Sequence, residues 1–537
     1  MTDLVEVRRG AYYDSVSLMQ VSQVVRRAPG ISAALVAMAT ELNTDLLAGM
    51  GFTVQEAFGA NDLLVAIRGE DSAAAEAGRS ALEEALAGLK AAGASAGGFG
   101  DAPPPRTLGA AVARTGANLA LVSVPGPNAF VEAMDAVTSG ASVMLFSDNV
   151  SVSQEIALKD AAAAADVLMM GPDCGTAVVA GVALGFANAV RAGSVGLVAA
   201  SGTGAQQVMC LLEAAGVGMS HCLGVGGRDL SSAVGGRSTR QALTALAADP
   251  LTESIIVVSK PPADEVLASI QEFATTLGKP VHWATLGLGR PDLTQAVEAA
   301  LATFADGIPV WPQWLAAVED ESDEPAEPLR DTPEPPGPAE PAEPAEPVGR
   351  AEGYLRGLFC GGTLADEAMI IASSASQRLG PIRSNIPLSP GLALGPDLRS
   401  PSHVVIDFGD DGLTQGRPHP MIDPSLRLDR IAVEGDDPSC AVLLLDLILG
   451  FGSHPDPAGE LAAAITSARA AATAGGRRLP VVVSLIGVES DPQGLGACAE
   501  TLHASGASVF VSNAQATRHA LSLLASATAQ EEISDVR

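Results

Sequence analysis

A glycine-rich loop, Ser201-Gly202-Thr203-Gly204, carries residues that could bind an anion. It follows the apolar run 195–200 and precedes a stretch of helical composition. At the start of a helix, unpaired backbone N–H groups and the helix dipole favour negative charge, so a phosphate can bind there without a lysine. The G-x-x-x-x-G-K-[ST] spacing of a P-loop is absent, which makes the loop a poor candidate for a nucleoside triphosphate. Taken alone, the loop fits a helix-capping turn equally well.

A second loop of similar composition, Gly361-Gly362-Thr363, precedes another apolar helix in LFCGGTLADEAMII (358–371). It also lacks a lysine. Two helix N-termini directed at one point would hold a phosphoryl group electrostatically from both sides. We therefore predict a phosphate site made of both loops, provided that the fold brings them together.

Polar residues are also crowded into the stretch GVGGRDLSSAVGGR (224–237). A guanidinium group suits a phosphate or a carboxylate. We predict that Arg228 is catalytic and that its neighbours in this stretch contact substrate, namely Gly226, Gly227, Asp229 and Arg237. A local Arg228–Asp229 pair is the alternative.

A second polar stretch, DFGDDGLTQGRPHPMIDP (407–424), places acidic, basic and imidazole groups between glycines and prolines. We predict that His419 is an acid/base or electrophilic group and that Arg417 is catalytic beside it. Asp407 and Asp423 are expected to contact substrate. The alternative is a polar surface loop. The Asp and Gly spacing would also suit Mg²⁺, without a calcium-loop pattern, so metal use stays open.

The composition excludes several classes of protein. The chain has 537 residues and a net charge of −31 without a basic stripe, which argues against nucleic acid or anionic membrane as partner. We find no signal-type start and no apolar segment near the roughly 18 residues of a membrane span, so we expect a cytoplasmic protein. The six cysteines form no C-x-x-C pair, which argues against disulfides and zinc. Cys174 and Cys360 are expected to be small buried residues rather than nucleophiles.

Short apolar runs alternate with Ala/Leu-rich helical stretches over most of the chain. Because the runs are apolar throughout, we expect strands buried on both faces, as in parallel α/β sheets. In the first part of the chain the expected strands are 119–124, 142–147, 166–171, 195–200, 254–259 and 280–285. Four more are expected after residue 350, in HVVIDFG, AVLLLDLILGFG, PVVVSLIG and SVFVSN. One segment, 319–350, holds 11 acidic residues and 9 prolines and is predicted to be a solvated linker. The predicted division is an N-terminal α/β domain (1–108), a CoA-binding-like Rossmann domain (109–190), a ligase-like flavodoxin-type domain (191–318), the linker (319–350) and a C-terminal ligase-like α/β domain (351–537).

Long motif strings in both halves resemble one superfamily. The run from DNVSVSQEIALKD to SGTG (148–204), with HCLGVGGRDLSSAVGG (221–236) and VSKPP (258–262), resembles the α subunit of succinyl-CoA synthetase and, more closely, the FdrA family. GLFCGGTLADEA (357–368), the stretch 405–424 and LLLDLILGFG (443–452) resemble the FdrA C-terminal half, which is similar to the ligase domain of the synthetase β subunit. On these motifs the chain is identified as a member of the FdrA family. The resemblance implies a multidomain α/β fold with Rossmann-like and flavodoxin-like parallel sheets, and it implies that the helices after both glycine loops point at a phosphate.

The sequence departs from the synthetases at three points. Their phosphorylated histidine lies in a Gly-His-Ala-Gly type loop after the region of SKPP, whereas this chain reads GKPVHWATLGLGRPDL (278–293). His282 in that stretch is expected to be a structural residue of a strand. The glycine fingerprint for the CoA diphosphate is missing near the N-terminus, and no ATP-grasp domain is recognisable.

Resemblance to FdrA implies a subunit of oxamate carbamoyltransferase, which interconverts carbamoyl phosphate and oxamate with oxalurate and phosphate in allantoin and purine catabolism. It implies companion subunits, and we also expect a homo-oligomer and no obligatory cofactor. The alternatives are an NDP-forming acid–thiol ligase, which would bind CoA and nucleotide, and a non-catalytic scaffold subunit.

Overall fold

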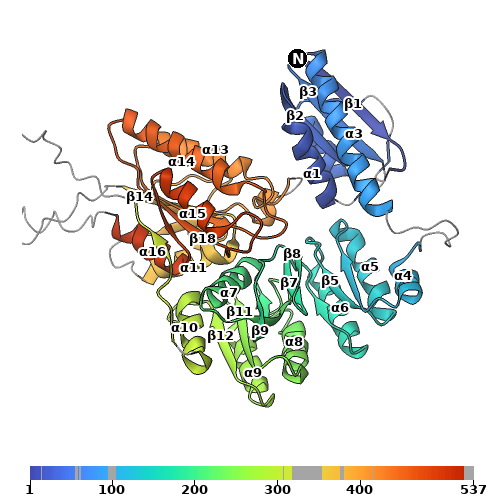
Figure 1. Cartoon of the computed structure of the whole chain (residues 1–537), viewed down its shortest axis with the longest axis vertical. Coiled ribbons are helices and arrows are strands. Elements are labelled where there is room, and N and C mark those ends of the chain that lie inside the picture. The colour runs from blue at the N-terminus through green and yellow to red at the C-terminus, as the bar shows by residue number, and fades with distance from the viewer. Residues whose placement is uncertain are drawn as a thin grey trace, which may run out of the picture.

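Four β-sheets organise the chain (Figure 1). The structure is a computed structural model, and it describes residues 1–11, 13, 15–54, 58–59, 62–94, 105–305, 307–316, 353–374, 380–414 and 417–524. The predicted linker 319–350 lies outside the described residues. None of the helices in the described part is long and apolar enough to cross a bilayer.

The N-terminal domain has a three-stranded antiparallel sheet in the order β1-β3-β2. Helices α1 and α3 cover one face, and Leu18, Val21 and Val25 of α1 are buried against the sheet. The elements are β1 (Thr2–Arg8), α1 (Ser15–Arg26), β2 (Ile31–Met38), α2 (Glu41–Gly49), β3 (Leu63–Gly69) and α3 (Ser72–Ala94).

The next domain has a three-stranded parallel sheet in the order β4-β5-β6. Its helix α6 starts in a capping box, in which the side chains of Ser151 and Gln154 satisfy each other's backbone N–H groups. The elements are α4 (Leu108–Thr115), β4 (Leu119–Val122), α5 (Gly126–Thr138), β5 (Ser142–Leu145), α6 (Val152–Ala164) and β6 (Met169–Met170).

The third domain has a six-stranded sheet in the order β12-β11-β9-β10-β7-β8, in which β7 is antiparallel to both of its neighbours, β10 and β8, and the other pairs are parallel. This hairpin falls within the stretch predicted as the Rossmann domain, yet it extends the sheet of the domain that follows. The elements are β7 (Thr176–Val179), β8 (Val182–Gly185), β9 (Ala192–Ala200), α7 (Gly202–Ala214), β10 (Met219–Gly224), α8 (Arg237–Ala248), β11 (Ser254–Ser259), α9 (Asp264–Ala274), β12 (Val281–Thr285) and α10 (Leu293–Phe304).

The C-terminal domain has a seven-stranded sheet in the order β13-β19-β18-β17-β14-β16-β15, parallel except for the edge strand β13. Its elements are β13 (Gln313–Trp314), β14 (Tyr354–Phe359), α11 (Gly362–Ser374), β15 (Ile382–Ser384), η1 (Pro390–Leu392), β16 (His403–Asp407), α12 (Asp411–Thr414), α13 (Ser425–Asp436), β17 (Cys440–Ile448), α14 (Pro457–Ala474), β18 (Val481–Ile486), α15 (Leu495–Ala504), β19 (Ala507–Phe510) and α16 (Asn513–Ser522).

The two larger sheets share one strand order. In both, the first parallel strand lies in the interior of the sheet, β9 between β10 and β11 and β14 between β16 and β17, with later strands on either side, as in flavodoxin-like folds. The predicted fold class is confirmed. In such sheets ligands bind beyond the carboxyl ends of the strands, where the strand order reverses. In this chain α7 and α11 start at those two points.

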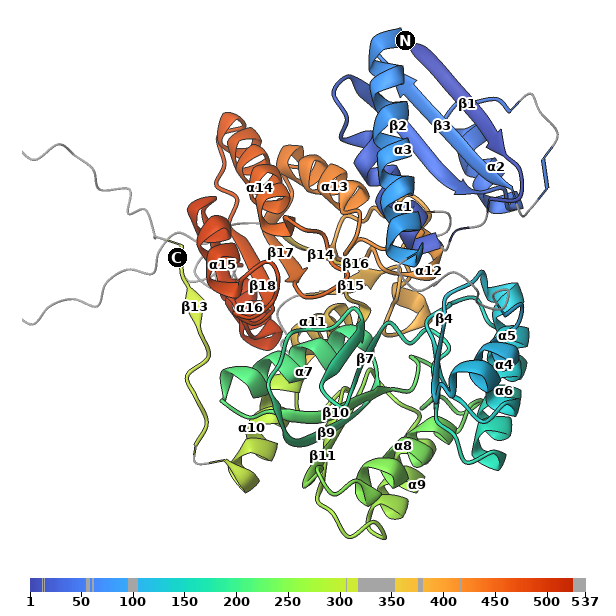
Figure 2. The same ribbon diagram turned by 45° about the vertical axis from the view of Figure 1, so that its right-hand side comes forward.

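The third and C-terminal domains pack as one body. Their α7, α10, α11 and α16 helices contribute to a single buried core, and Figure 2 shows α7 and α11 side by side. Glu367 on α11 accepts the N–H of Leu293 at 2.7 Å and the side-chain amide of Asn513 at 2.7 Å. The backbone N–H of Asn513 in turn donates to Gln207 at 3.0 Å. These bonds fix α7 relative to α11.

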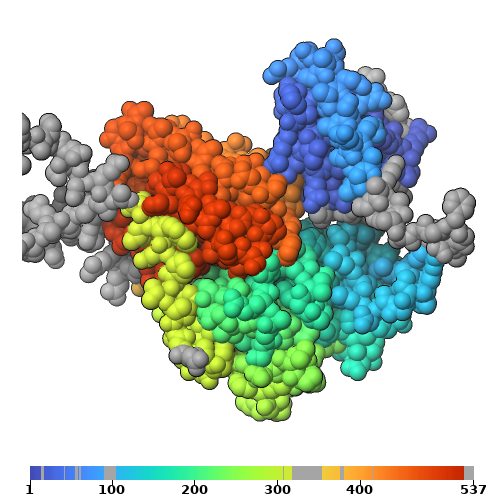
Figure 3. Space-filling view, viewed as in Figure 1, coloured from blue at the N-terminus to red at the C-terminus, as the bar shows by residue number. Residues whose placement is uncertain are grey.

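The N-terminal domain makes a narrower contact with the rest of the molecule, as the space-filling view shows (Figure 3). The linking contacts come from helix α1, where Arg26 Nη1 lies 3.0 Å from a carboxylate oxygen of Asp423. The third and C-terminal domains, by contrast, meet over a broad continuous surface in the same view.

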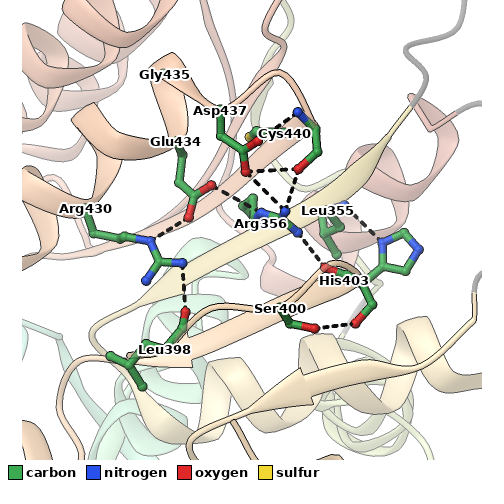
Figure 4. Close-up of polar contacts among 12 residues, drawn as sticks. Leu355, Arg356, Leu398, Ser400, His403, Arg430, Glu434, Gly435, Asp437 and Cys440 are labelled. Carbon is green, nitrogen blue, oxygen red and sulfur yellow. Dashed lines mark hydrogen bonds and ion pairs between the residues drawn. The ribbon is translucent and has the colours of Figure 1, made fainter. Parts of the chain in front are cut away.

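A buried arginine ties strand β14 to its neighbours in the C-terminal domain (Figure 4). The Arg356 side chain, 3% exposed, donates to Glu434 at 3.2 Å and to the backbone oxygen of Ser402 at 2.5 Å. It also donates to Asp437 at 3.3 Å and to the Ser439 hydroxyl at 2.9 Å. A charge so deeply buried is tolerated only with this many partners.

Replacing Arg356 by methionine should therefore lower the free energy of unfolding by about 2–3 kcal/mol, because Glu434 keeps only Arg430 as its partner. Urea denaturation of the full chain, followed by the intrinsic fluorescence of its three tryptophans, measures the loss. Arg383→Met is the matched control, since Arg383 makes only long contacts to backbone oxygens at 3.4 and 3.5 Å. Equal effects of the two substitutions would contradict the prediction.

Candidate functional site

The N-termini of α7 and α11 meet directly. Ser201 caps α7 by accepting the N–H of Gly204 at 2.9 Å, and its hydroxyl is hydrogen-bonded to that of Thr363 at 2.6 Å. The contact joins the start of one helix to the first turn of the other, across 162 residues of sequence. The structure thus brings the two predicted loops together.

Only glycine fits at two positions of the second loop. A Cβ at Gly361 would lie 2.8 Å from the Thr203 hydroxyl oxygen, and a Cβ at Gly362 would lie 2.6 Å from a carboxylate oxygen of Asp407. Real Cβ atoms do not approach other atoms so closely. The missing side chains therefore allow the two helix starts and the Asp407 carboxylate to converge.

A buried carboxylate fixes the start of α11. Asp446, at the end of β17, accepts the N–H groups of Cys360 at 2.8 Å and Gly361 at 2.9 Å. Its charge is balanced by the fully buried Arg427, whose Nη1 lies 2.6 Å away. Within the described residues, the N–H groups of Gly202 and Thr203 at the start of α7 have no acceptor. These donors can therefore bind an anion.

Lys260 supplies the positive charge that neither loop contains. It follows β11, and its Cε and Nζ lie 3.4 and 3.7 Å from the position that a Cβ at Gly227 would take. The ammonium group interacts electrostatically with Asp173, Asp366 and Asp407, which belong to three different loops or helix starts. Lys260 is exposed, so the cluster opens to solvent. A cation surrounded by converging strand ends is suited to an anionic substrate group.

The carboxyl groups of this cluster hold protons near neutral pH. Desolvation raises the pKa of Asp173 and of Asp407 to about 7 and that of Asp366 to about 6, although the Lys260 cation partly opposes each shift. Desolvation also raises the pKa of Asp411. Groups with such values exchange protons efficiently at physiological pH.

His419 is neutral in this site. Burial, aided by the Arg427 cation, lowers the pKa of the imidazole to about 4. Nδ1 accepts the N–H of Met421 at 3.3 Å, which assigns the proton to Nε2. Nε2 points to the Asp407–Gly409 turn, 2.7 Å from the position of a Cβ at Gly409. His419 therefore suits a hydrogen-bond donor, and of the two predicted roles the electrophilic one fits better than proton acceptance.

Three of the predicted substrate contacts lie in other surroundings. Asp229 is fully buried and bonds Lys159 at 2.7 Å as well as the N–H groups at the start of α8. Arg237 pairs with Asp160 at 2.8 Å, and Asp423 pairs with Arg26 of the N-terminal domain. Asp229 is thus enclosed in a buried network, whereas the ion pairs of Arg237 and Asp423 are partly exposed, so contact of these two residues with substrate stays a prediction.

The two predicted catalytic arginines take different positions. Arg228 donates to the Val150 backbone oxygen at 2.8 Å and pairs with Glu155 at 2.9 Å, so its partner is not the predicted alternative, Asp229. It still influences Asp173 and Asp411 electrostatically. Arg417 is exposed, and its backbone N–H bonds Thr414 at 3.0 Å. Gly226 and Gly227 line the Lys260 side of the site, against residues 171–173.

Thiol and metal chemistry find no support in the described part of the chain. All six cysteines are buried, and burial raises the pKa of Cys174 to about 12 and that of Cys360 well above its ordinary value. Neither is therefore a thiolate at neutral pH. No group of three or more His, Cys, Asp or Glu side chains in the described residues is arranged to hold a metal ion.

In the comparison with known proteins, two family models match the two ends of the chain. Residues 1–102 match the model of the AllF heavy metal-associated domain, and residues 358–523 match the CoA-ligase model. YahF of Escherichia coli, described as an uncharacterised protein, is 38% identical over 499 residues, which cover 92% of this chain and 93% of YahF. The chain belongs to the YahF family.

Members of wider families are more distant from this YahF-family chain. The α subunit of ADP-forming succinate–CoA ligase from Aquifex aeolicus is 28% identical over 193 residues, and the match spans 34% of the chain and 61% of that subunit. An ATP citrate lyase structure from Methanothrix soehngenii has a TM-score of 0.30 and 19% identity, covering 33% of this chain and 30% of that one. The CoA-ligase match of residues 358–523 and the similarity to the succinate–CoA ligase α subunit support the ligase prediction better than the carbamoyltransferase prediction.

The N-terminal model is named for heavy metals, but the matching residues 1–102 of this YahF-family chain contain no cysteine that could bind such a metal. Cysteine first occurs at position 174, beyond the matched residues 1–102. Soft metals are usually held by cysteine thiolates. The N-terminal domain therefore matches its model without the usual thiolate ligands.

Proposed function

We propose that this chain binds the phosphoryl end of an acyl phosphate between α7 and α11 and transfers its acyl group, as an enzyme of the CoA-ligase type. The observation that carries the proposal is the hydrogen bond between Ser201 and Thr363, which joins the starts of two helices from separate domains. Two helix N-termini and the Lys260 ammonium then surround one position. Such preorganised positive groups stabilise the charge of a leaving phosphate.

The reaction needs no covalent enzyme intermediate. A nucleophile of the second substrate attacks the carbonyl carbon and forms the new bond, while the bond from that carbon to the phosphate oxygen breaks. The phosphate leaves with the electron pair, and the proton of the nucleophile passes to a carboxylate, for which Asp407 and Asp173 have suitable pKa values of about 7. His419 Nε2–H is available to polarise the carbonyl oxygen.

The first candidate for the acceptor is the thiol of coenzyme A, and the step is then the acyl-transfer half-reaction of an acid–thiol ligase, in which acyl phosphate and the thiol give acyl-CoA and phosphate. It is supported by the CoA-ligase match of residues 358–523 and by the similarity to the succinate–CoA ligase α subunit. The first strand-to-helix turn of the β4-β5-β6 domain fits a diphosphate poorly, however. A Cβ at Gly126, the first residue of α5, would lie 2.4 Å from the Asp148 backbone oxygen, so protein backbone already covers this helix start.

The second candidate is oxamate as acceptor and carbamoyl phosphate as donor, as the FdrA resemblance implies. The observation that favours it is the position of His282, the histidine nearest in sequence to the stretch where the synthetases carry their phosphorylated residue. His282 lies in β12, stacked edge-on against Phe304 and 3.4 Å from the Thr303 hydroxyl, and burial lowers its pKa. A ready-made acyl phosphate removes the need for such a carrier. We infer membership of the FdrA family and expect companion subunits.

The test is phosphorolysis by the full chain, alone and with the products of its neighbouring genes. Oxalurate or an acyl-CoA is incubated with phosphate, and ³¹P NMR detects the acyl phosphate formed. Thr203→Val should abolish the product, whereas Thr466→Val, at a helix threonine of α14, should not. Acyl phosphate from acyl-CoA alone would support the ligase, and from oxalurate alone the carbamoyltransferase. No acyl phosphate from either substrate would contradict both.

The raised carboxyl pKa values predict that anion binding strengthens in acid. Asp407 and Asp173 are ionised at pH 8 and repel an anion, whereas they are neutral at pH 5.5, so sulfate affinity should rise by about tenfold over this range. Sulfate is the probe for calorimetric titration because its own charge stays constant. Asp407→Asn should flatten the profile by raising the affinity at pH 8. A profile that is the same in both proteins would disprove the role of Asp407.

A further inference from the structure

Helix α1 of the N-terminal domain presents two different faces. Leu18, Val21 and Val25 are buried against the domain's own sheet. Gln23 and Arg26 of the helix, with Arg27 directly after its last residue, form the outward face. In Figures 1 and 2 this helix lies at the end of the domain that approaches the C-terminal domain. The polar face of α1 is therefore the docking face of the domain.

This face contacts two loops of the C-terminal domain. Gln23 Nε2 donates to the Ile422 backbone oxygen at 2.5 Å, and Arg26 Nη1 lies 3.0 Å from Asp423. Arg27 contacts His454 and lies 3.4 Å from Glu460. The two loops are themselves joined by a bond from the His454 N–H to the Met421 oxygen at 2.8 Å.

The first of these loops is the one that carries His419. The N–H groups of Ile422 and Asp423 both donate to the His419 backbone oxygen, at 2.8 and 3.1 Å. The N–H of Met421 donates to the ring at 3.3 Å. The five residues 419–423 thus form a closed turn, with the imidazole at one end and Asp423, held by Arg26, at the other.

The small free energy of the Arg26–Asp423 ion pair indicates that the pair positions the turn 419–423 rather than stabilises the fold. The Arg26 side chain is 40% exposed and that of Asp423 12%. Ion pairs of this exposure contribute about 0–1 kcal/mol to stability. The pair is thus too weak to hold the domains together alone, but it acts directly on the turn that orients the imidazole.

We propose that α1 positions His419 for catalysis through Arg26, Asp423 and Gln23, so that the N-terminal domain completes the site in the C-terminal domain. This inference rests on the proposed function for its kinetic consequence, and its structural consequence can be measured separately. Arg26 and Asp423 are positioning residues, since they touch the loop rather than the reacting atoms.

The structural test is amide hydrogen exchange of the full chain, read by mass spectrometry on peptides that span residues 417–424. Arg26→Ala should speed exchange in this turn by up to about fivefold, which corresponds to the upper end of the energy of such a pair, whereas Arg26→Lys should restore most of the protection. Arg79→Ala is the matched control, because Arg79 is 45% exposed and pairs only with Glu6 and Glu76 of its own domain. Unchanged exchange in Arg26→Ala would overturn the proposal.

The kinetic test uses the acyl-phosphate assay. Displacing a catalytic group by about 1 Å can lower the rate by about 100-fold, so Arg26→Ala should lower kcat by about 10- to 100-fold with little change in KM. Loss of activity in Thr203→Val but not in Arg26→Ala would overturn this inference and leave the proposed function intact. Activity that survives in Thr203→Val would instead contradict the proposed function, while hydrogen exchange still decides the role of Arg26.

Discussion

Replacing Lys260 by methionine should lower the rate of phosphate-dependent acyl transfer about 100- to 1,000-fold, which is the usual effect of removing one charge-stabilising donor. Lys260 faces Asp173, Asp366 and Asp407, and its ammonium is positioned to offset their charge when a phosphate binds. Inorganic phosphate affinity, measured by calorimetry, should fall with the rate. The melting temperature should stay close to that of the natural chain, because Lys260 is exposed.

Lys279→Met provides the control for this substitution. Lys279 precedes β12, at the opposite ends of the same strands, and bonds the backbone oxygens of Leu246 and Asp249. Its replacement should leave turnover and phosphate affinity unchanged. Equal effects of the two substitutions, or full activity in Lys260→Met, would show that the anion binds elsewhere. Arg at position 260 should retain part of the rate, because the charge is kept while its geometry changes.

Replacing Asp446 by alanine should lower the free energy of unfolding by about 3–5 kcal/mol. The substitution leaves Arg427, 2% exposed, without its carboxylate at 2.6 Å. It also leaves the N–H groups of Cys360 and Gly361 at the start of α11 without an acceptor. Asp446 thus supports the fold and the second loop at the same time.

Thermal and urea denaturation of the full chain, again followed by intrinsic tryptophan fluorescence, measure this loss of free energy. Asp446→Asn is the control, because it retains the shape and one acceptor oxygen and should be intermediate in stability. An unchanged midpoint in Asp446→Ala would mean that water or another group compensates Arg427. It would contradict the role assigned to the buried pair.

Much of the α/β architecture could be predicted from the sequence because its strands are apolar on both faces. The runs 195–200, 254–259 and 280–285 became β9, β11 and β12, and the ten predicted runs as a whole contain strands of the sheets. Two strands of the larger sheets, β10 and β14, were not predicted because polar residues interrupt their apolar pattern. β14 contains the buried Arg356 and β10 contains His221, so neither reads as an apolar run.

The candidate site was predictable where local sequence determines local structure. Gly-rich turns that start helices identified Ser201 and Thr363, and the packing of the third domain against the C-terminal domain brings their hydroxyl oxygens within 2.6 Å. Lys260 was not predicted as a site residue, although it lies in the motif VSKPP (258–262), because its neighbours in the site, such as Gly227 and Asp173, are distant in the sequence. Polar residues between glycines were interpreted as binding groups, yet Asp229 bonds Lys159 in a buried network. Composition alone does not distinguish a carboxylate that binds substrate from one that belongs to a buried structural network.

The shared core of the third and C-terminal domains bears on how the chain is organised as an assembly. Buried residues of α7 and α11 belong to one core, and the two ends of the phosphate site come from opposite sides of the predicted linker 319–350. An interface of this kind resembles that of permanent subunits. The covalent connection then contributes effective concentration rather than geometry. The third and C-terminal domains are thus related to each other like the two subunits of an obligate heterodimer, although they belong to one polypeptide.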